Sequence, residues 1–469
     1  MGHATGFDAD WVDEVLLFGD DSDICLVLDR PVTRRELRAL VAQRQAELAA
    51  HGLSAGGSAA LRLPPSLAFI TNLLAVWRTG AQAVLLDYRL TDYEVDAARQ
   101  RLLPQVVIAP KTMPTPGPRG FFEVVEVVTP CPGRPAATPH AVIQLSSGST
   151  GPSKVIGRTA ANLIEEIHRY VQIPGVPRAG ERIVVLASMV HVLGLVGGLL
   201  YGLYAGAQVA IPRRLMPDAI FDAIRIDDRP TTLLGVPFHV ELLTAVAEPP
   251  KLPQLTGMTT GGELVRSAVH EAFVDRYQVR LGNMYGMTEV GVIATDIFGR
   301  HRPALAPAPG LRVCVEGGEL LVSLPASPYV GLADPTRWAD GWLHTRDAGT
   351  VRPETGLVTI QGRLDSQISV GGLKVDLTEV EHTLAAIPDV AGAVVVHDRG
   401  IAAYVTLADG GTPDSLDAAL TTRLAAYKRP RRVHVLDQMP RTATGKLVRD
   451  PTVLRAAVPA GGEPRHSPR

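Results

Sequence analysis

The chain has 469 residues, of which 46% are hydrophobic and 20% charged, a composition typical of a globular protein with about three domain-sized units. A formal net charge of −2 gives no reason to expect a nucleic acid or an anionic membrane as a partner. The three cysteines are odd in number and widely spaced, so we expect neither a disulfide framework nor a metal cluster, and a reducing cytoplasm is the simplest location. Residues 1–15 carry acids and lack an apolar run, which argues against a signal peptide.

Short apolar segments alternate with helical patterns through the first two thirds of the chain. Residues 67–80 and 267–278 have apolar residues at helical spacing. This alternation predicts an α/β region with largely parallel sheets. The strands are expected at 59–63, 82–86, 105–109, 182–186, 208–211 and 231–236.

Residues 183–211 contain no charged side chain and are long enough to span a bilayer. The β-branched residues at 182–186 favour a buried strand, and the glycine-rich run 194–207 favours a closely packed core helix. We therefore expect no membrane insertion.

The pattern of predicted secondary structure changes twice toward the C-terminus. Short strands joined by turns predict a small β subdomain at about 306–362, which completes an N-terminal core of residues 1–362. Residues 363–457 predict a smaller, mobile α+β domain, and residues 458–469 a disordered tail.

The stretch "LSSGSTGPSKV" at 145–155 lies between a predicted strand at 139–145 and a predicted helix at 160–171. Its glycines and hydroxyls are typical of a backbone nest that binds phosphate oxygens, and Lys154 adds a positive charge. The common nucleotide-loop spacing G-x-x-x-x-G-K-[ST] fails, because Ser153 stands where the second glycine belongs. The loop alone is equally compatible with a surface turn.

Four further stretches carry polar residues of chemical interest: "NMYGMTEVG" at 283–291, "GWLHTRDAG" at 341–349, "QGRLDSQISVGGLKVDLTEVE" at 361–381 and "MPRTATGKLVRD" at 439–450. Each alone is compatible with an ordinary solvated loop. In this order and together with the loop at 145–155, they resemble the adenylate-forming superfamily of acyl- and aryl-CoA synthetases, peptide-synthetase adenylation domains and luciferases. The pattern is most similar to the acyl- and aryl-acid CoA ligases.

The resemblance implies that a small carboxylic acid reacts with ATP and Mg²⁺ to give an acyl adenylate and pyrophosphate. The acyl group would then pass to a thiol of coenzyme A or of a phosphopantetheinyl carrier protein. Because an anion must approach a polyanion, this chemistry needs cations and oriented donors where charge develops.

The resemblance also implies roles for individual residues. Lys446 would bridge the substrate carboxylate and the α-phosphate, Thr288 would contact the α-phosphate region, and Glu289 would bind Mg²⁺. Asp347 would accept the ribose hydroxyls, and Asp365 would be the hinge of the mobile domain. The remaining nucleotide-binding candidates are Ser146, Ser147, Gly148, Ser149, Thr150, Gly151, Lys154, Gly262, Glu263, Tyr285, Gly286, Met287 and Arg363.

For the acid pocket, His191 resembles the family's gating histidine, which we also count among the catalytic candidates. No acid stands at the start of the segment "GVPFHVELL", which disfavours an α-amino acid and favours an aromatic or modest aliphatic acid. An ordinary core position is an equal alternative for Phe238, Met284 and Val290. The pocket candidates are His191, Pro237, Phe238, Gly261, Gly262, Met284 and Val290.

Three departures from the family pattern concern the ribose site and the thioester-forming face. Arg346 replaces the usual glycine before Asp347, so that its charge lies beside the nucleotide or faces solvent. Ser369 and Lys374 replace a lysine and an arginine. The stretch between Tyr285 and Asp347 is also compressed, as in a specialised ligase of secondary metabolism. Alternatives are a β-amino acid or nitrite as the acid, an amine as the acceptor, and a non-catalytic nucleotide-binding protein.

Overall fold

The computed structural model describes residues 9–115, 119–146, 154–331, 334–364, 366–408, 410–440 and 447–459. The chain forms two compact units. The first comprises residues 1–88, 102–145 and 155–362, and the second comprises 89–101, 146–154 and 363–469. No helix within the described ranges combines the length and the apolar character that crossing a membrane requires.

The larger sheet of the first unit has nine strands in the order β15-β14-β13-β12-β11-β9-β10-β1-β2. The six strands from β13 to β1 in this order are parallel, whereas β14, β15 and β2 are antiparallel to their neighbours. The strands are β1 (Ile24–Val27), β2 (Pro31–Thr33), β9 (Arg182–Val185), β10 (Gln208–Ala210), β11 (Thr231–Gly235), β12 (Leu255–Gly261), β13 (Arg280–Met287), β14 (Gly291–Asp296) and β15 (Ala306–Pro307).

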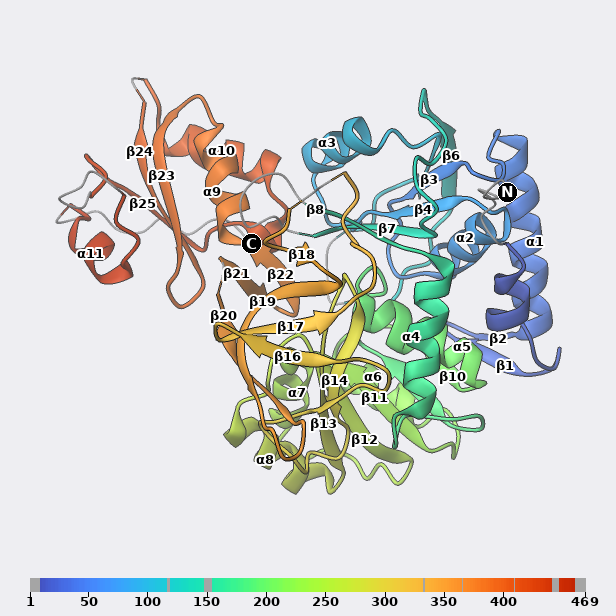
Figure 1. The fold of residues 1–469 in the computed structure, drawn as a ribbon. Helices are drawn as coiled ribbons and strands as arrows, with labels where there is room; N and C mark the ends of the chain where they lie inside the picture. Colours follow the sequence, from blue (N-terminus) through green and yellow to red (C-terminus); the bar gives the residue numbers. More distant parts are fainter. Residues whose placement is uncertain are drawn as a thin grey trace. The chain divides into compact units, whose positions relative to one another are not determined.

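A second sheet of six strands has the order β6-β5-β3-β4-β7-β8. Its strands β5, β3, β4 and β7 are parallel, and β6 is antiparallel to β5. The two sheets therefore confirm the expected α/β class with mostly parallel strands (Figure 1). The strands are β3 (Ser58–Leu61), β4 (Gln82–Leu85), β5 (Val106–Pro110), β6 (Glu126–Pro130), β7 (Val142–Ser146) and β8 (Lys154–Arg158).

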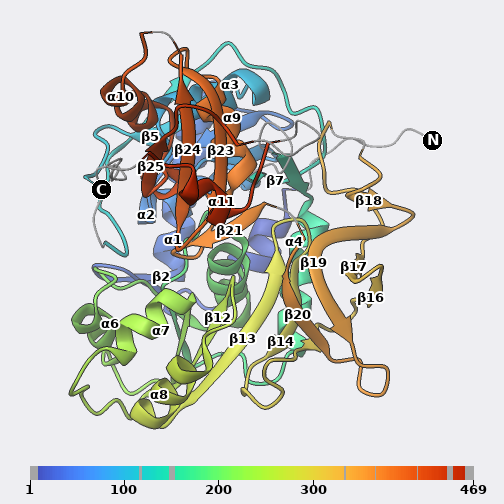
Figure 2. The ribbon, with the colours of Figure 1, turned by 90° about the vertical axis from the view of Figure 1, so that its left-hand side faces the viewer.

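Helices cover both faces of the nine-stranded sheet because its central strands are apolar on both sides. On one face, three helices share an apolar core with β9, β11 and β12. Figure 2 shows these green and yellow helices on the same side of β12. Other helices share a core with both sheets on the opposite face. The first group is α6 (Pro217–Ile224), α7 (Pro237–Thr244) and α8 (Ser267–Tyr277); the second is η1 (Val12–Leu16), α1 (Arg34–Ala50), α2 (Leu67–Arg78), α4 (Ala160–Gln172), η2 (Leu193–Leu200) and α5 (Tyr201–Ala205).

The glycine-rich run predicted as a core helix forms η2, a π-helical segment, and α5, which continues it. A Cβ atom at Gly197 would lie 2.5 Å from the hydroxyl of Tyr170, and one at Gly202 would lie 2.3 Å from Cγ2 of Val209. The glycines therefore let this segment approach α4 and the sheet closely, which confirms the interpretation as buried core.

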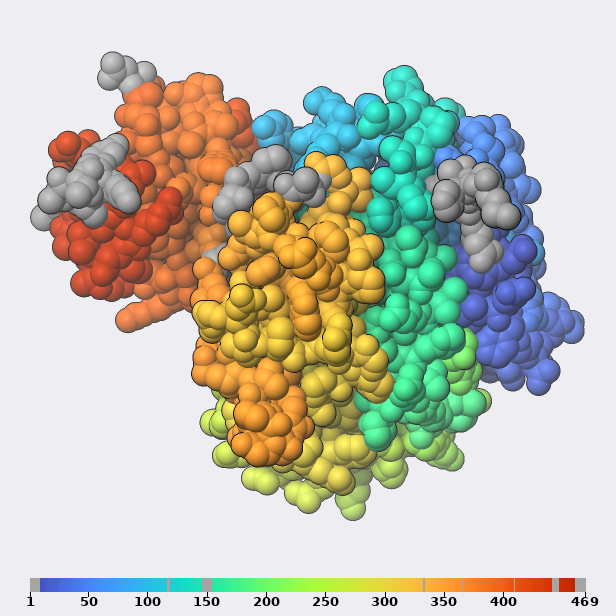
Figure 3. Space-filling view, viewed as in Figure 1, coloured from blue at the N-terminus to red at the C-terminus, as the bar shows by residue number. Residues whose placement is uncertain are grey.

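The predicted β subdomain is a five-stranded antiparallel sheet, β16-β17-β19-β18, with β20 paired to β19. The chain after this sheet's β17 runs back to β8, where Gly157 donates to the carbonyl of Pro328 over 2.9 Å. Figure 3 shows this yellow and orange surface directly beside the teal surface of α4. The strands are β16 (Val313–Glu316), β17 (Glu319–Ser323), β18 (Trp338–Ala339), β19 (Trp342–Val351) and β20 (Val358–Arg363).

The second unit has its own core between a three-stranded sheet and its helices. The sheet order is β23-β24-β25, and β21 and β22 form a separate hairpin. The elements are β21 (Gln367–Val370), β22 (Leu373–Asp376), α9 (Leu377–Ala385), β23 (Val390–His397), β24 (Ile401–Leu407), α10 (Pro413–Arg423), η3 (Ala426–Lys428), β25 (Arg432–Val435) and α11 (Pro451–Ala456).

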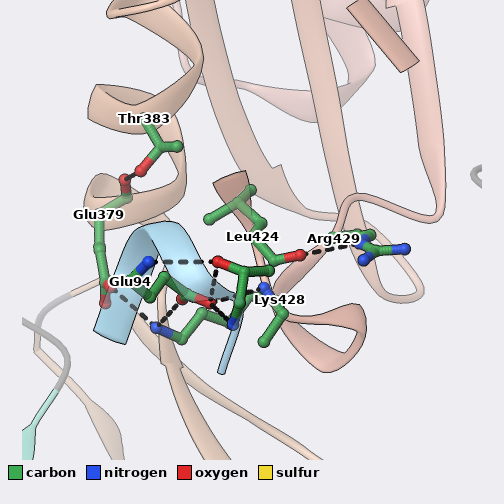
Figure 4. A network of polar contacts seen from close by, with 8 residues as sticks. Glu94, Glu379, Thr383, Leu424, Lys428 and Arg429 are labelled. Carbon is green, nitrogen blue, oxygen red and sulfur yellow. Dashed lines mark hydrogen bonds and ion pairs between the residues drawn. The ribbon is translucent and has the colours of Figure 1, made fainter. Parts of the chain in front are cut away.

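Helix α3 (Asp92–Leu102) joins this second unit through a buried lysine, as Figure 4 shows. The ammonium group of Lys428 donates to Glu94 over 2.8 Å and to Glu379 over 2.9 Å. Glu94 also accepts the backbone N–H of Ala425. Burial would lower the pKa of Lys428, but the two carboxylates and Tyr427 outweigh burial and raise it. Lys428 is therefore charged, and its ammonium group is bound by Glu94 and Glu379.

Candidate active site

The candidate acid pocket gathers at the carboxyl ends of four neighbouring parallel strands. In the sheet register, Gly235 at the end of β11 lies beside Thr260, and Gly261 at the end of β12 lies beside Met284 in β13. In open α/β sheets, ligands bind at this edge. All the predicted pocket residues lie in β12 and β13 or in the segments that follow β9, β11, β12 and β13, so the fold brings these candidates to one edge.

The turn that carries Thr288 and Glu289 connects β13 to β14. Helix α4 holds this turn from one side, because Arg169 donates to the carbonyl of Val290 over 3.2 Å and Glu166 accepts the N–H of Val292 over 3.0 Å. At Gly291, where φ is +86°, a Cβ atom would lie 2.1 Å from the carboxyl carbon of Glu166. The glycine of "TEVG" is therefore required by both its backbone conformation and its close approach to Glu166.

Glu166 itself is completely buried and forms an ion pair with Arg158 of β8, with 2.6 Å between Nη1 and Oε2. A buried carboxylate needs such compensation because desolvation disfavours its charge. The strand that follows the candidate phosphate loop is thus connected, through Arg158 and Glu166, to the turn that carries Glu289.

Glu289 has a partner that the sequence did not reveal. The hydroxyl of Tyr329 donates to Oε1 of Glu289 over 3.1 Å, and both side chains are buried. Burial, together with the nearby Glu289 carboxylate, raises the pKa of Tyr329, so its hydroxyl stays protonated as a donor. The stretch "ASPYVGL" contains no periodicity or motif that predicts this contact.

Tyr285 and Asp347, two predicted nucleotide-binding residues, contact each other directly. The hydroxyl of Tyr285 donates to Oδ2 of Asp347 over 2.6 Å, a short distance that is typical of a bond to a carboxylate. Asp347 is buried on β19, and the hydroxyl of Thr345 accepts its N–H. The structure therefore fixes a buried carboxylate next to an aromatic ring.

Arg346, the departure from the family's glycine, adopts the left-handed backbone conformation with φ of +60°. Glycine adopts this conformation without steric cost, whereas other residues pay for it. Here Glu319 accepts the N–H of Arg346 over 2.8 Å, and the guanidinium donates to the carbonyl of Thr336 over 2.7 Å. The side chain of Arg346 thus contacts its own β-rich sheet.

His191 lies half-buried at the start of η2, and its Nε2 is 3.7 Å from Oδ2 of the buried Asp87. Asp87 follows β4 in "LLDYRL" and was not among the predicted site residues, since an isolated acid there has no distinctive signal. The predicted gate therefore has an acidic neighbour in the fold.

Helix α7 begins with two of the pocket candidates, Pro237 and Phe238. Phe238 is about half exposed, with 51% of its surface accessible, whereas His239 beside it is buried. Nδ1 of His239 accepts the N–H of Val236, and burial lowers its pKa to about 4. Met284 and Val290 are buried in hydrophobic cores, so ordinary packing accounts for them as well as pocket lining does.

The remaining predicted site residues are placed as follows. Gly262 and Glu263 are exposed after β12, Gly286 and Met287 are partly buried at the end of β13, Lys154 is buried at the start of β8, and Arg363 is partly buried at the end of β20. Ser146 ends β7. The candidates outside the described residues are Ser147, Gly148, Ser149, Thr150, Gly151, Asp365 and Lys446.

Comparison with known families decides the identity of this arrangement. The model of the AMP-binding enzyme family matches residues 19–325, and that of the AMP-binding enzyme C-terminal domain matches residues 379–446. The chain belongs to the AMP-binding enzyme family. Within it, the chain is an AMP-forming acid–thiol ligase, which confirms the resemblance inferred from the motifs.

Curated relatives agree with this assignment, and a solved structure agrees with the fold. The chain is 30% identical to benzoate–CoA ligase of Thauera aromatica, over 66% of this chain and 65% of that ligase. It is 28% identical to indoleacetate–CoA ligase of Aromatoleum aromaticum, over 90% of this chain and 92% of that ligase. The fold is similar to o-succinylbenzoate CoA synthetase of Bacillus subtilis, with a TM-score of 0.81, 23% identity and coverage of 98% of this chain and 99% of that chain.

The described residues suit ATP and a hard cation. The buried carboxylate of Asp347 offers acceptors for hydroxyl groups, and the ring of Tyr285 lies beside it. Within the described ranges, no group of three or more His, Cys, Asp and Glu side chains could hold a metal. A lone carboxylate such as Glu289 fits Mg²⁺, which is usually bound by one or two carboxylates together with phosphate oxygens and water.

Proposed function

We propose that the protein activates a small aryl carboxylic acid with ATP and Mg²⁺ and transfers the acyl group to coenzyme A. The observation that carries this proposal is the common edge of β9, β11, β12 and β13, where the mostly apolar pocket candidates lie on strands adjacent to the turn that carries Glu289. Such an edge can present an acid to a nucleotide bound beside it.

In this proposal Asp347 accepts the ribose hydroxyls, and Tyr285 packs against the adenine while its hydroxyl orients Asp347. Glu289 would hold Mg²⁺, which would supply positive charge to neutralise the phosphates. The residues of the loop at 146–154 hold the β- and γ-phosphates. Arg363 provides a further contact to the ribose or a phosphate.

The first reaction is an in-line displacement. A carboxylate oxygen of the acid forms a bond to the α-phosphorus of ATP, and the bond from that phosphorus to pyrophosphate breaks. In the second reaction, the thiolate of coenzyme A attacks the acyl carbon and AMP leaves. Lys446 stabilises the first transition state, and its position near the C-terminus allows the mobile domain to withdraw it before the second.

The chemistry of the pocket favours an aryl acid. The N-terminal part of α7 offers the exposed ring of Phe238 and the side chain of Pro237, with no carboxylate to hold an α-amine. The names of the relatives, which include benzoate–CoA and indoleacetate–CoA ligases, point in the same direction and also support coenzyme A as the acceptor.

ATP–pyrophosphate exchange across a panel of aryl, fatty, β-amino and α-amino acids, with nitrite included, tests the first reaction. We expect exchange with one or a few aryl acids, and exchange with none of them would refute the proposal. Mass spectrometry after addition of coenzyme A then tests the acceptor. Transfer only to a carrier protein or an amine would refute coenzyme A and retain adenylation.

The variant Lys446→Ala tests the division of labour between the two reactions. We expect loss of pyrophosphate exchange but normal formation of the thioester from a supplied acyl adenylate. A variant that loses both reactions equally would contradict the proposed role.

A further inference from the structure

Tyr329 connects two parts of the candidate nucleotide site through different atoms. Its backbone forms a bridge with Ile156 of β8, the strand that directly follows the candidate phosphate loop. On either side of this bridge, Gly157 donates to the carbonyl of Pro328 and Val330 donates to the carbonyl of Val155, each over 2.9 Å. The main chain at Tyr329 is therefore fixed relative to β8.

The side chain of Tyr329 reaches the turn between β13 and β14. Its hydroxyl donates to Oε1 of Glu289 over 3.1 Å, and only 8% of Tyr329 and 9% of Glu289 remain exposed. Tyr329 belongs to a buried hydrophobic cluster that also contains Leu343 and Ile293. The hydroxyl thus has a defined position from which it contacts the carboxylate.

We propose that Tyr329 is a positioning residue, whose hydroxyl orients the carboxylate of Glu289 for the divalent cation that accompanies ATP. Glu289 lies in a turn, and a glutamate has three rotatable side-chain bonds, so a hydrogen bond from a fixed donor restricts its orientation. Because the backbone of Tyr329 pairs with β8, the hydrogen bond fixes the position of the Glu289 carboxylate relative to this strand, which follows the candidate phosphate loop. This inference rests on the proposed nucleotide chemistry.

The variant Tyr329→Phe tests the proposal, since it removes the hydroxyl and keeps the ring. Partners that orient metal ligands typically contribute 10- to 100-fold in metal affinity or activity. We expect about tenfold weaker binding of Mn²⁺–ATP, measured by electron paramagnetic resonance with Mn²⁺ as the probe. Binding of AMP without metal, measured by calorimetry, should stay unchanged.

Tyr201→Phe is a matched control, because Tyr201 is a buried tyrosine of the same unit whose hydroxyl donates to the carbonyl of Pro177. It should bind both ligands as the wild type does. Unchanged Mn²⁺–ATP binding in Tyr329→Phe would overturn the proposal, and so would an equal loss of AMP binding, which indicates general damage.

The double variant that combines Tyr329→Phe with Glu289→Gln provides a second test. It compares the effect of Tyr329→Phe with and without the Glu289 carboxylate, so it does not depend on the stability of a single variant. If Tyr329 acts through Glu289, removal of its hydroxyl should add no further loss of Mn²⁺–ATP affinity in the Glu289→Gln background. An independent tenfold loss there would overturn the proposal. Binding of Mn²⁺–ATP needs no acid substrate. If no acid supports pyrophosphate exchange, the proposed function is refuted, but the binding measurements still decide the role of Tyr329.

Discussion

Removal of one partner of the buried ion pair of Arg158 and Glu166 should strongly destabilise the first unit, because the other charge is then left buried without compensation. Arg158 is 3% and Glu166 0% exposed, with 2.6 Å between the charged atoms, so neither charge can be hydrated if the other is lost. Breaking a buried pair by removing one partner costs about 3–5 kcal/mol. In Glu166→Gln the amide oxygen can still accept the N–H of Val292, so we expect a loss of about 3 kcal/mol in the free energy of unfolding.

Urea unfolding followed by tryptophan fluorescence measures this loss directly. All four tryptophans, at positions 11, 77, 338 and 342, lie in the first unit, so the signal reports on that unit. The neighbouring variant Glu165→Gln is the control, because Glu165 is 63% exposed in its pair with Arg169 and should cost less than about 1 kcal/mol. A loss below about 1 kcal/mol in Glu166→Gln, or an equal loss in both variants, would refute the reasoning.

Three further predictions use the same assay. Gly291→Ala should destabilise the protein by at least about 2 kcal/mol, because its φ is +86° and the added Cβ would meet the Glu166 carboxyl group at 2.1 Å; a neutral result would contradict this geometry. Burial lowers the pKa of His239 to about 4. As the pH falls below about 6.5, the histidine therefore binds a proton in the unfolded state before it does so in the folded state. The free energy of unfolding should decrease by about 2 kcal/mol between pH 7 and pH 5. That part of the pH dependence should be absent in His239→Asn, and equal pH profiles of the two proteins would disprove it. Arg346→Ala should be less stable than Arg346→Gly by about 1 kcal/mol, because both variants lose the guanidinium and only glycine adopts φ of +60° without strain; the reverse order would rule out strain at this position.

The sequence correctly predicted the helices and strands whose pattern of apolar and capping residues lies within one short segment. The apolar runs at 182–186 and 231–236 became buried parallel strands, and the helix predicted at 160–171 begins at the predicted position because Thr159 caps it. Tyr285 and Asp347 were both found as motif residues, although their mutual hydrogen bond depends on the packing of β13 against the β-rich sheet.

The contacts that the sequence did not predict connect segments far apart in the chain. Tyr329 reaches Glu289 only because its segment pairs with β8, and Asp87 reaches His191 only because two sheets share one core. An isolated tyrosine or aspartate has the same local signal whether or not such a partner exists. The left-handed conformation of Arg346 is likewise set by Glu319, which accepts its N–H from the neighbouring strand.

The close packing of η2 limits which of its residues could change during evolution. A Cβ atom at Gly194 would lie 2.4 Å from the carbonyl oxygen of Ser188, and one at Gly198 would lie 2.9 Å from Cγ2 of Val185. An alanine at Gly194 would require the backbone to move, and one at Gly198 would require Val185 to shift. Helix η2 therefore tolerates little change at these positions. If the proposed acid pocket is correct, relatives that take other acids should differ mainly at α7, where Phe238 is half exposed.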